Sequence, residues 1–243
     1  MIAFLLAAGL GTRLRPLTLD RPKALVEING KPLIYWNLKR LKQAGFRQVI
    51  INVHYFADMV EEYLNDLNWG MKLIVSDERN LLRETGGGLK YAWPLFENAN
   101  PILMCNVDVL TTLDLSSFYQ SHVRSEALAT LAVRSRKSSR HLLFDSDLTL
   151  AGWKHNRTGE TRMVREVETT PLAFSGVQVI DRELFNWFPD EEKFSIIDVY
   201  LAAAAEHRIS AFPHDEDEWL DVGKPESLEP AERLAKKIES TFN

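Results

Sequence analysis

The stretch that decides the fold is Ile2–Pro32, IAFLLAAGLGTRLRPLTLDRPKALVEINGKP. It opens with a short apolar run at residues 2–6, typical of a buried strand, which leads directly into the small residues Ala7-Ala8-Gly9. The loop that follows carries Gly11, Thr12, Arg13 and Lys23. Glycines allow backbone N–H groups to approach a ligand closely, and fixed cations attract phosphate. The segment therefore predicts a buried strand followed by a phosphate-binding loop.

Positive charge is concentrated in this segment. Among its basic residues are Arg13, Arg15, Arg21, Lys23 and Lys31, against only Asp20 and Glu27. The whole chain, in contrast, carries a net charge of −5. A local excess of positive charge on an acidic chain indicates a small anionic ligand and not a nucleic-acid-binding surface.

The bulk composition fits one large domain. The chain has 243 residues, of which 45% are hydrophobic, so a single α/β domain over 1–243 is expected. Its one cysteine, Cys105, excludes an internal disulfide and suits a reducing cytoplasm. No apolar stretch approaches the roughly 20 residues that span a bilayer, and no signal peptide is evident. We expect a cytoplasmic protein without membrane or nucleic-acid partners.

Strand-like and helix-like patterns alternate along the first half. Apolar runs predict strands at 2–6, 48–53, 72–75 and 102–105, and helical spacing predicts helices at 32–43, 57–67 and 85–94. This alternation predicts an α/β fold with a Rossmann-like, mostly parallel sheet flanked by helices. In such sheets ligands bind at the carboxyl ends of the strands.

The second half is less regular. Strands are expected at 127–133 and 174–180, and helices at 196–207 and 225–241. Residues 141–153 predict a small β-hairpin insertion, whose role the sequence leaves open.

Residues 6–32 carry a family resemblance. The stretch LAAGLGTRLRPLTLDRPKALVEINGKP resembles the N-terminal signature of the sugar-1-phosphate nucleotidyltransferases, or nucleotide-sugar pyrophosphorylases. It differs from the dinucleotide-binding fingerprint because the third glycine position is Leu14, and no Gly-Lys-Ser/Thr triplet indicates a Walker A loop. The resemblance implies the nucleotide-diphospho-sugar transferase type of fold. Because no hexapeptide repeat is present, we expect no C-terminal β-helix acyltransferase domain.

Two aspartates resemble the metal ligands of that family. Asp108 follows an apolar strand in Asn106-Val107-Asp108, and Asp221 lies in Trp219-Leu220-Asp221-Val222-Gly223. Carboxylates at a strand end suit Mg²⁺, with water and phosphate oxygens completing the coordination. The alternative is that each aspartate merely forms a turn. The resemblance implies Mg²⁺ as cofactor, held by Asp108 and Asp221.

The resemblance also implies the catalytic cations and the nucleotide site. Lys23 would neutralise the reacting phosphates, and Arg13 would contact the β- and γ-phosphates, to which a guanidinium is well matched. A second glycine segment, Glu84–Gly88, would lie against the base. Glu78 before it would offer an acceptor to the N3–H of uracil or thymine. The expected nucleotide-binding residues are Ala7, Ala8, Gly9, Gly11, Thr12, Arg13, Glu78, Thr85, Gly86 and Gly87.

The sugar site is expected at Asn106, Glu166 and Gly176. Phe174-Ser175-Gly176 resembles the glycine segment at the family's sugar pocket. Relatives place a Glu-Lys pair upstream, whereas this chain has Arg165-Glu166-Val167-Glu168. Glu166 would take part of that role, and the departure leaves the identity of the sugar open.

The predicted reaction is attack of a sugar 1-phosphate on the α-phosphate of a nucleoside triphosphate, with UTP as the expected donor. The chain looks most like the N-acetylmuramate 1-phosphate uridylyltransferases. Mannose-1-phosphate guanylyltransferase and glucose-1-phosphate thymidylyltransferase are the alternatives within the family. A catalytically silent nucleotide-sugar sensor and a Rossmann dehydrogenase are alternatives outside it. The substrates are small molecules, and the oligomeric state is left open.

Overall fold

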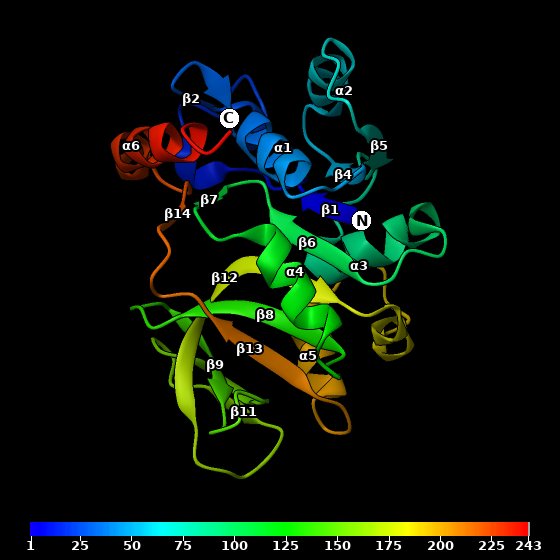
Figure 1. Cartoon of the computed structure of the whole chain (residues 1–243), viewed down its shortest axis with the longest axis vertical. Coiled ribbons are helices and arrows are strands. Elements are labelled where there is room, and N and C mark those ends of the chain that lie inside the picture. The colour runs from blue at the N-terminus through cyan, green and yellow to red at the C-terminus, as the bar shows by residue number, and fades with distance from the viewer. Residues whose placement is uncertain (243) are drawn as a thin grey trace.

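The computed structural model describes residues 1–242, which form a ten-stranded mixed sheet with helices on its faces (Figure 1). The strands of this sheet are β1 (Ile2–Leu6), β4 (Gln48–Val53), β5 (Lys72–Asp77), β6 (Ile102–Asn106), β8 (Ala129–Arg134), β9 (Arg140–Phe144), β10 (Leu150–His155), β11 (Thr161–Met163), β12 (Thr170–Ile180) and β13 (Ile209–Pro213). Two short pairs lie outside it, β2 (Glu27–Ile28) with β3 (Lys31–Pro32) and β7 (Val109–Thr111) with β14 (Trp219–Asp221).

Six α-helices accompany these strands in residues 1–242: α1 (Leu33–Gln43), α2 (Ala57–Asn65), α3 (Glu84–Ala92), α4 (Leu115–Val123), α5 (Ile196–Ala203) and α6 (Leu228–Glu239). The short 3₁₀ helices are η1 (Thr12–Leu14), η2 (Lys23–Leu25), η3 (Trp93–Phe96), η4 (Arg182–Trp187) and η5 (Pro225–Ser227). None of the helices in this part of the chain has the length and apolar character needed to cross a bilayer.

The N-terminal half of the sheet is parallel, in the order β5-β4-β1-β6. Its strands are mostly apolar in their centres, because helices lie on both faces. On β1, Phe4 joins the core cluster on one face, whereas Ala3 and Leu5 join the cluster on the other. The register aligns Leu6 with both Asn52 and Asn106, so the carboxyl ends of β1, β4 and β6 lie side by side. The predicted α/β fold is confirmed, and this edge is where its ligand site is expected.

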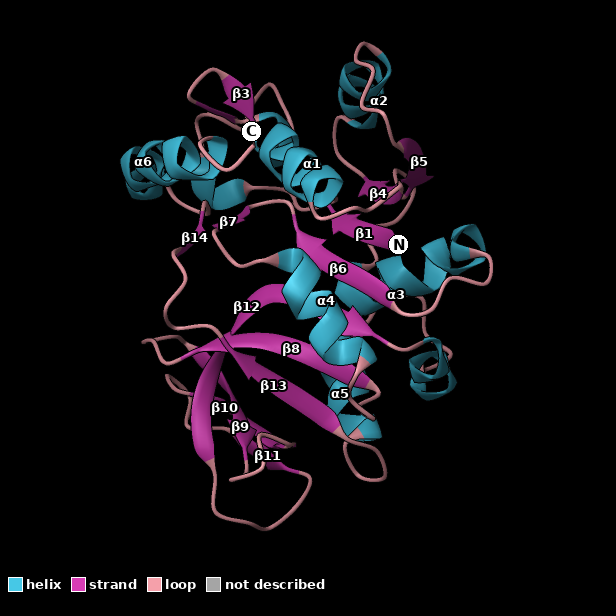
Figure 2. Cartoon of the chain, in the orientation of Figure 1, coloured by secondary structure: helices cyan, strands magenta, loops and turns pink. Residues whose placement is uncertain are grey.

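Strand β12 joins the two halves. It runs antiparallel to β6 on one side and to β8 and β9 on the other. Through β9 it carries the predicted hairpin, in which β9 and β10 pair and β11 adds a short edge strand (Figure 2). The hairpin insertion is therefore an extension of the main sheet.

The C-terminal helix α6 packs beside α1 and the N-terminal loop (Figure 1). A third core cluster contains Leu14 of the loop, Trp36 of α1, Val222 after β14, and Ala231 and Leu234 of α6. The amphipathic pattern of residues 225–241 is explained by this contact, since the apolar face of α6 covers that cluster. One helix thereby holds both the loop and the end of β14 in place.

Helix α4 was not expected from the sequence. Its residues, LSSFYQSHV, bury only part of one face, and its start depends on a cap. The Asp114 carboxylate accepts hydrogen bonds from the backbone N–H groups of Ser116 and Ser117, at 2.9 and 3.2 Å. Because Ser and Asp are weak helix formers, periodicity alone gave no helix here.

Candidate active site

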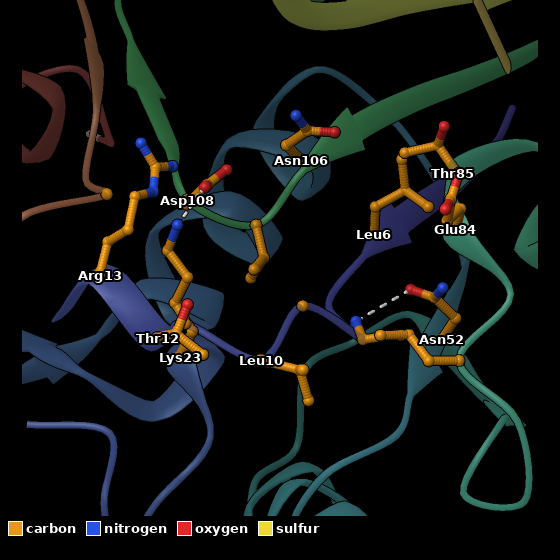
Figure 3. Close-up of a pocket in the computed structure, with 16 residues that line it drawn as sticks. Leu6, Leu10, Thr12, Arg13, Lys23, Asn52, Glu84, Thr85, Asn106 and Asp108 are labelled. Carbon is orange, nitrogen blue, oxygen red and sulfur yellow. Dashed lines mark hydrogen bonds and ion pairs between the residues drawn. The ribbon is translucent and has the colours of Figure 1, made fainter. Parts of the chain in front are cut away.

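A pocket of about 430 Å³ opens at the carboxyl ends of β1, β4 and β6 (Figure 3). Its walls come from the N-terminal loop, from the segment that starts α3, and from the turn after β14. It is lined by Leu6, Ala8, Gly9, Leu10, Gly11, Thr12, Arg13, Lys23, Asn52, Leu82, Glu84, Thr85, Asn106, Val107, Asp108 and Gly223. Many of the predicted site residues thus converge here, although they come from distant parts of the chain.

Asn52 fixes the turn that begins the phosphate-binding loop. Its Oδ1 accepts hydrogen bonds from the backbone N–H groups of Ala7 and Ala8, at 2.7 and 3.3 Å. Its Nδ2 donates to Glu78 Oε1 at 2.8 Å. Asn52 was missed in the sequence, although an amide inside the apolar run VIINV is a signal for a buried polar function.

Glu78 and Ala7 lie behind the pocket wall and not in it. Glu78 is 1% exposed, and burial raises the pKa of its carboxyl group. Its Oε2 is buried without a hydrogen-bond partner. The prediction that Glu78 meets the base directly is therefore corrected, because its carboxyl group supports Asn52 and, through it, the backbone at Ala7 and Ala8.

Gly11 allows the loop to fold back onto Lys23. Its φ of +62° lies in the left-handed region that favours glycine. A Cβ at this position would lie 3.0 Å from both Lys23 Cβ and Thr18 Cγ2. The Thr18 hydroxyl also donates to the Gly11 carbonyl, at 2.9 Å. A side chain at residue 11 would therefore push apart the segment that carries Lys23.

Lys23 is brought to the pocket by η2 and is 8% exposed. Its Nζ forms an ion pair with Asp108 Oδ2 (Figure 3). A lysine this buried needs a counter-charge, because an unpaired ammonium in the interior is costly. The pair places one cation and one carboxylate side by side at the end of β6.

Asp108 and Asp221 are brought together by the β7–β14 pair. Asp221 lies opposite Val109 in that ladder, and the Val222 N–H donates to the Asp108 carbonyl at 2.8 Å. Burial, followed by repulsion from Asp108, raises the pKa of the Asp221 carboxyl group. Asp221 Oδ1 is buried without a hydrogen-bond partner. Two carboxylates that repel one another, one with an orphaned oxygen, fit a shared divalent cation.

Gly223 and Arg13 complete this corner. A Cβ on Gly223 would lie 2.6 Å from Asp221 Oδ1 and 2.9 Å from Arg13 Nη2. The guanidinium of Arg13 therefore reaches the same region as the two carboxylates (Figure 3).

Residues 1–242 contain no group of three or more His, Cys, Asp or Glu side chains that could hold a metal. A cation at the aspartate pair would accordingly take most of its ligands from water or substrate oxygens, as Mg²⁺ commonly does.

A second wall extends from Asn106 along β12. Gly176 has a φ of +74°, and a Cβ there would lie 2.7 Å from Asn106 Nδ2. The neighbouring Ser175 carbonyl accepts a hydrogen bond from Trp219 Nε1 at 2.8 Å, and the Ser175 hydroxyl lies 2.8 Å from His214 Nε2. The structure thus brings Asn106 and Gly176 together, as a sugar site would require.

Besides Ala7 and Glu78, the predicted site residues that do not line this pocket are Gly86, Gly87, Glu166, Gly176 and Asp221. Gly86 and Gly87 are buried inside α3, within the helix predicted at 85–94. A Cβ on Gly86 would lie 2.5 Å from the Phe194 ring, and one on Gly87 would lie 2.2 Å from the Glu192 carbonyl oxygen. These glycines make room for a neighbouring segment of the protein. Glu166 is exposed and is absent from the pocket walls.

The comparisons with known proteins agree with this geometry. Residues 2–142 match the nucleotidyl transferase family. The chain is 36% identical to the N-acetylmuramate alpha-1-phosphate uridylyltransferase of Caulobacter vibrioides, over 96% of this chain and 97% of that protein. It is 33% identical to the protein of the same name from Neisseria meningitidis, over 97% of this chain and 98% of that one.

A solved structure shares the fold. The inositol-1-phosphate CTP transferase from T. maritima matches with a TM-score of 0.79, over 98% of this chain and 96% of that chain. The two sequences are 20% identical, so this similarity concerns the arrangement of strands and helices.

Proposed function

The chain belongs to the nucleotidyl transferase family and is a sugar-1-phosphate nucleotidyltransferase, and we propose that its donor is UTP and its acceptor is N-acetylmuramate 1-phosphate. The observation that carries the chemistry is the cluster of buried Lys23 with the partly buried Asp108 and Asp221, beside a glycine-rich pocket that Lys23 and Asp108 line. The choice of donor and acceptor comes from the relatives, which match nearly the whole chain.

The reaction needs no nucleophile from the protein. A phosphate oxygen of the sugar 1-phosphate attacks the α-phosphorus of the triphosphate, the bond to the β-phosphate breaks, and pyrophosphate leaves. The attacking oxygen is already ionised, so the protein must align the reactants and stabilise charge. In this proposal Lys23 stabilises the charge that shifts at the α-phosphate, and Arg13 binds the β- and γ-phosphates.

The pocket walls supply the remaining binding groups. The backbone of Ala8 and Gly9, held by Asn52, lines one side, and Gly11 and Thr12 continue it toward Arg13. Thr85 lies across the pocket, near the start of α3. We assign the base and triphosphate to this channel and the sugar to the wall formed by Asn106 and Gly176. Gly86, Gly87 and Glu166 have no contact role in this proposal.

Asp108 and Asp221 are proposed to hold Mg²⁺. When bound, the ion would neutralise phosphate charge and orient the triphosphate. The pairing of Lys23 with Asp108 keeps the ammonium close to that position. We also place the enzyme in the cytoplasm, where its nucleotide donor is available. Cys105 is compatible with this, since burial raises the pKa of its thiol to about 12 and leaves it unreactive.

The test is a matrix of donors and acceptors. The protein is incubated with UTP, dTTP, GTP, CTP or ATP, with Mg²⁺, and with N-acetylmuramate 1-phosphate, mannose 1-phosphate or glucose 1-phosphate, and pyrophosphate release is measured. We expect UTP to be preferred, with dTTP next, because uracil and thymine share one hydrogen-bonding edge and a methyl group discriminates by about 1–3 kcal/mol. Preference for GTP with mannose 1-phosphate would move the assignment to the guanylyltransferases. Absence of pyrophosphate release with every pair would favour a nucleotide-sugar sensor.

A further inference from the structure

Arg136 is an arginine beside the site whose guanidinium has no direct carboxylate partner among residues 1–242. It lies in the turn between β8 and β9, partly buried, and it makes no ion pair with any carboxylate in this part of the chain. Other arginines with carboxylate partners include Arg79, Arg83 and Arg165. A half-buried guanidinium that no carboxylate contacts directly keeps N–H groups free to bind an anion from outside the chain.

The position of Arg136 is fixed by several contacts. Its guanidinium lies over the Trp219 ring, with Cζ 4.2 Å from the ring centroid, and its Nη2 donates to the Phe174 carbonyl at 3.0 Å. Its Nε is buried without a hydrogen-bond partner. A stacked guanidinium loses less freedom when it binds an anion, because its plane is already oriented.

These contacts place Arg136 on the sugar side of the site. Trp219 lies two residues before Asp221 on β14, and its Nε1 donates to the Ser175 carbonyl next to Gly176. A Cβ on Gly176 would lie 2.7 Å from Asn106 Nδ2, so the Gly176 backbone passes close to Asn106. The wall proposed for the sugar therefore continues from Asn106 through β12 to the Trp219–Arg136 stack. Burial lowers the pKa of the Arg136 guanidinium. The negative charge of Asp221 raises this pKa, and the positive charge of Arg134 lowers it.

The hairpin gives this arginine its support. A ring nitrogen of His141, on β9, lies 2.9 Å from the Arg136 carbonyl oxygen. The Asn156 amide, after β10, donates to the Ser138 carbonyl at 2.7 Å and lies 2.6 Å from His141 Nδ1. The turn that carries Arg136 is thus braced by both strands of the insertion whose role the sequence left open.

We propose that Arg136 determines acceptor specificity by binding a carboxylate carried on the sugar of the sugar 1-phosphate. The inference rests on the proposed function, and it names the feature of the acceptor that the site reads. N-acetylmuramate differs from N-acetylglucosamine by a lactyl ether that ends in a carboxylate. Arginine is suited to such a group, because its N–H fork matches a carboxylate in two-point contact. The 1-phosphate is the other anion of the substrate, and the experiment separates the two.

The test compares two acceptors that differ only in the carboxylate. Values of kcat/KM are measured with UTP and either N-acetylmuramate 1-phosphate or N-acetylglucosamine 1-phosphate, for the wild type, Arg136→Met and Arg136→Lys. We expect Arg136→Met to lower the acidic-to-neutral ratio of kcat/KM by about 10–100-fold, the range expected for a lost charge-assisted hydrogen bond. Arg136→Lys keeps the charge but loses the planar fork, and it should fall between the two.

The control is Arg140→Met, which removes the same charge from an exposed position on β9. It should leave the ratio unchanged. Thermal unfolding of each variant checks that the sheet is intact. A ratio unchanged in Arg136→Met overturns the inference, as does an equal loss with both acceptors, which would assign Arg136 to the phosphate. A wild type that releases pyrophosphate with neither acceptor overturns the proposed substrate and the inference with it. A wild type that uses N-acetylmuramate 1-phosphate supports the proposed function whatever the Arg136 variants do.

Discussion

Replacing Asp221 by asparagine should stabilise the protein and inactivate it. In the absence of a bound cation, the ionised form of the Asp221 carboxyl group is destabilised. Burial and the charge of Asp108 both disfavour its ionised form, and their effect exceeds the attraction of Lys23 and Arg13, so its pKa is raised. Its Oδ1 has no hydrogen-bond partner. Asparagine keeps the size of the side chain and removes the charge.

The magnitude follows from that orphaned oxygen. A buried polar atom left without a hydrogen bond costs about 1–3 kcal/mol, and an amide recovers only part of this. We expect Asp221→Asn to raise the free energy of unfolding by about 1–2 kcal/mol at pH 7.5. At roughly 2–4 °C per kcal/mol for a chain of this size, the Tm should rise by about 2–8 °C.

The pH dependence has a definite sign. A carboxyl group whose pKa is raised by folding destabilises the native state only when it is ionised. The penalty is therefore absent at pH values below the unfolded pKa of about 3.9. It is fully present above the raised native pKa. The difference in Tm between Asp221→Asn and the wild type should shrink as the pH is lowered from 7.5 toward 4.

The assay is thermal unfolding with a chelator, and then with Mg²⁺. The wild type should gain stability with Mg²⁺, by about 2.7 kcal/mol at 100 times the Kd. Asp221→Asn should gain much less and should release almost no pyrophosphate. Asp66→Asn, at an exposed position after α2, is the matched control and should change neither property. A variant that is less stable than the wild type in chelator, or that gains equally from Mg²⁺, would refute the two-carboxylate site.

Three further predictions address other parts of the molecule. Lys23→Ala should lower kcat by about 10²–10³-fold with a smaller change in KM, because Lys23 contacts charge that shifts during transfer. Steady-state pyrophosphate release measures both constants, and a change in KM alone would contradict the prediction. Gly87→Ala should destabilise the fold by about 3 kcal/mol, because the new Cβ would clash with the Glu192 carbonyl oxygen, and this outweighs the gain of about 1 kcal/mol in helix propensity. At Gly9 a Cβ would have no atom within 4 Å, so Gly9→Ala should keep the Tm and weaken nucleotide binding in calorimetry. Burial lowers the pKa of His122 and of His214 to about 4, so the stability that they contribute as neutral side chains should be lost as the pH falls from 6.5 toward 4. His214→Gln should therefore make the Tm less dependent on pH in that range. His207→Gln, at an exposed position, should leave that dependence unchanged.

Elements with a local signal could be predicted from the sequence. The strands expected at 2–6 and 48–53 have the bounds of β1 and β4, because each is a continuous apolar run between polar turns. Strand β12 begins at Thr170, earlier than the expected residue 174, because residues 170–172 are held by pairing with β9. Pairing between distant segments leaves no periodic trace, so the extra residues could not be found locally.

The glycines show why motif reading is ambiguous. A missing Cβ indicates that something approaches the backbone, but it does not say whether a ligand or the protein does so. At Gly11 the neighbour is Lys23, which also lines the pocket, so the expected site and the packing reason coincide. At Gly86 and Gly87 the neighbours are Phe194 and Glu192, more than a hundred residues away, and no local pattern reveals them.

The aspartate pair depends on contacts that are still less visible in the sequence. Asp108 follows β6 in the parallel half of the sheet, whereas Asp221 arrives on β14 after the chain has passed through the hairpin and α5. The two segments are joined by the short β7–β14 ladder, by the Val222 N–H bond to the Asp108 carbonyl and by hydrogen bonds between Thr112 and Glu218. Two hydrogen-bonded strands of three residues are marginal alone, so the pair needs support from elsewhere.

That support comes from α6. Its residues Ala231 and Leu234 share one apolar cluster with Val222 beside Asp221 and with Leu14 beside Arg13. The helix therefore buries the segment that carries the second carboxylate and the loop that carries the arginine against the same surface. A helix that lines no part of the pocket thus sets the distance between the phosphate-binding loop and the carboxylate pair. The helix predicted at 225–241 thus supports the candidate active site through the apolar face that it packs against Leu14 and Val222.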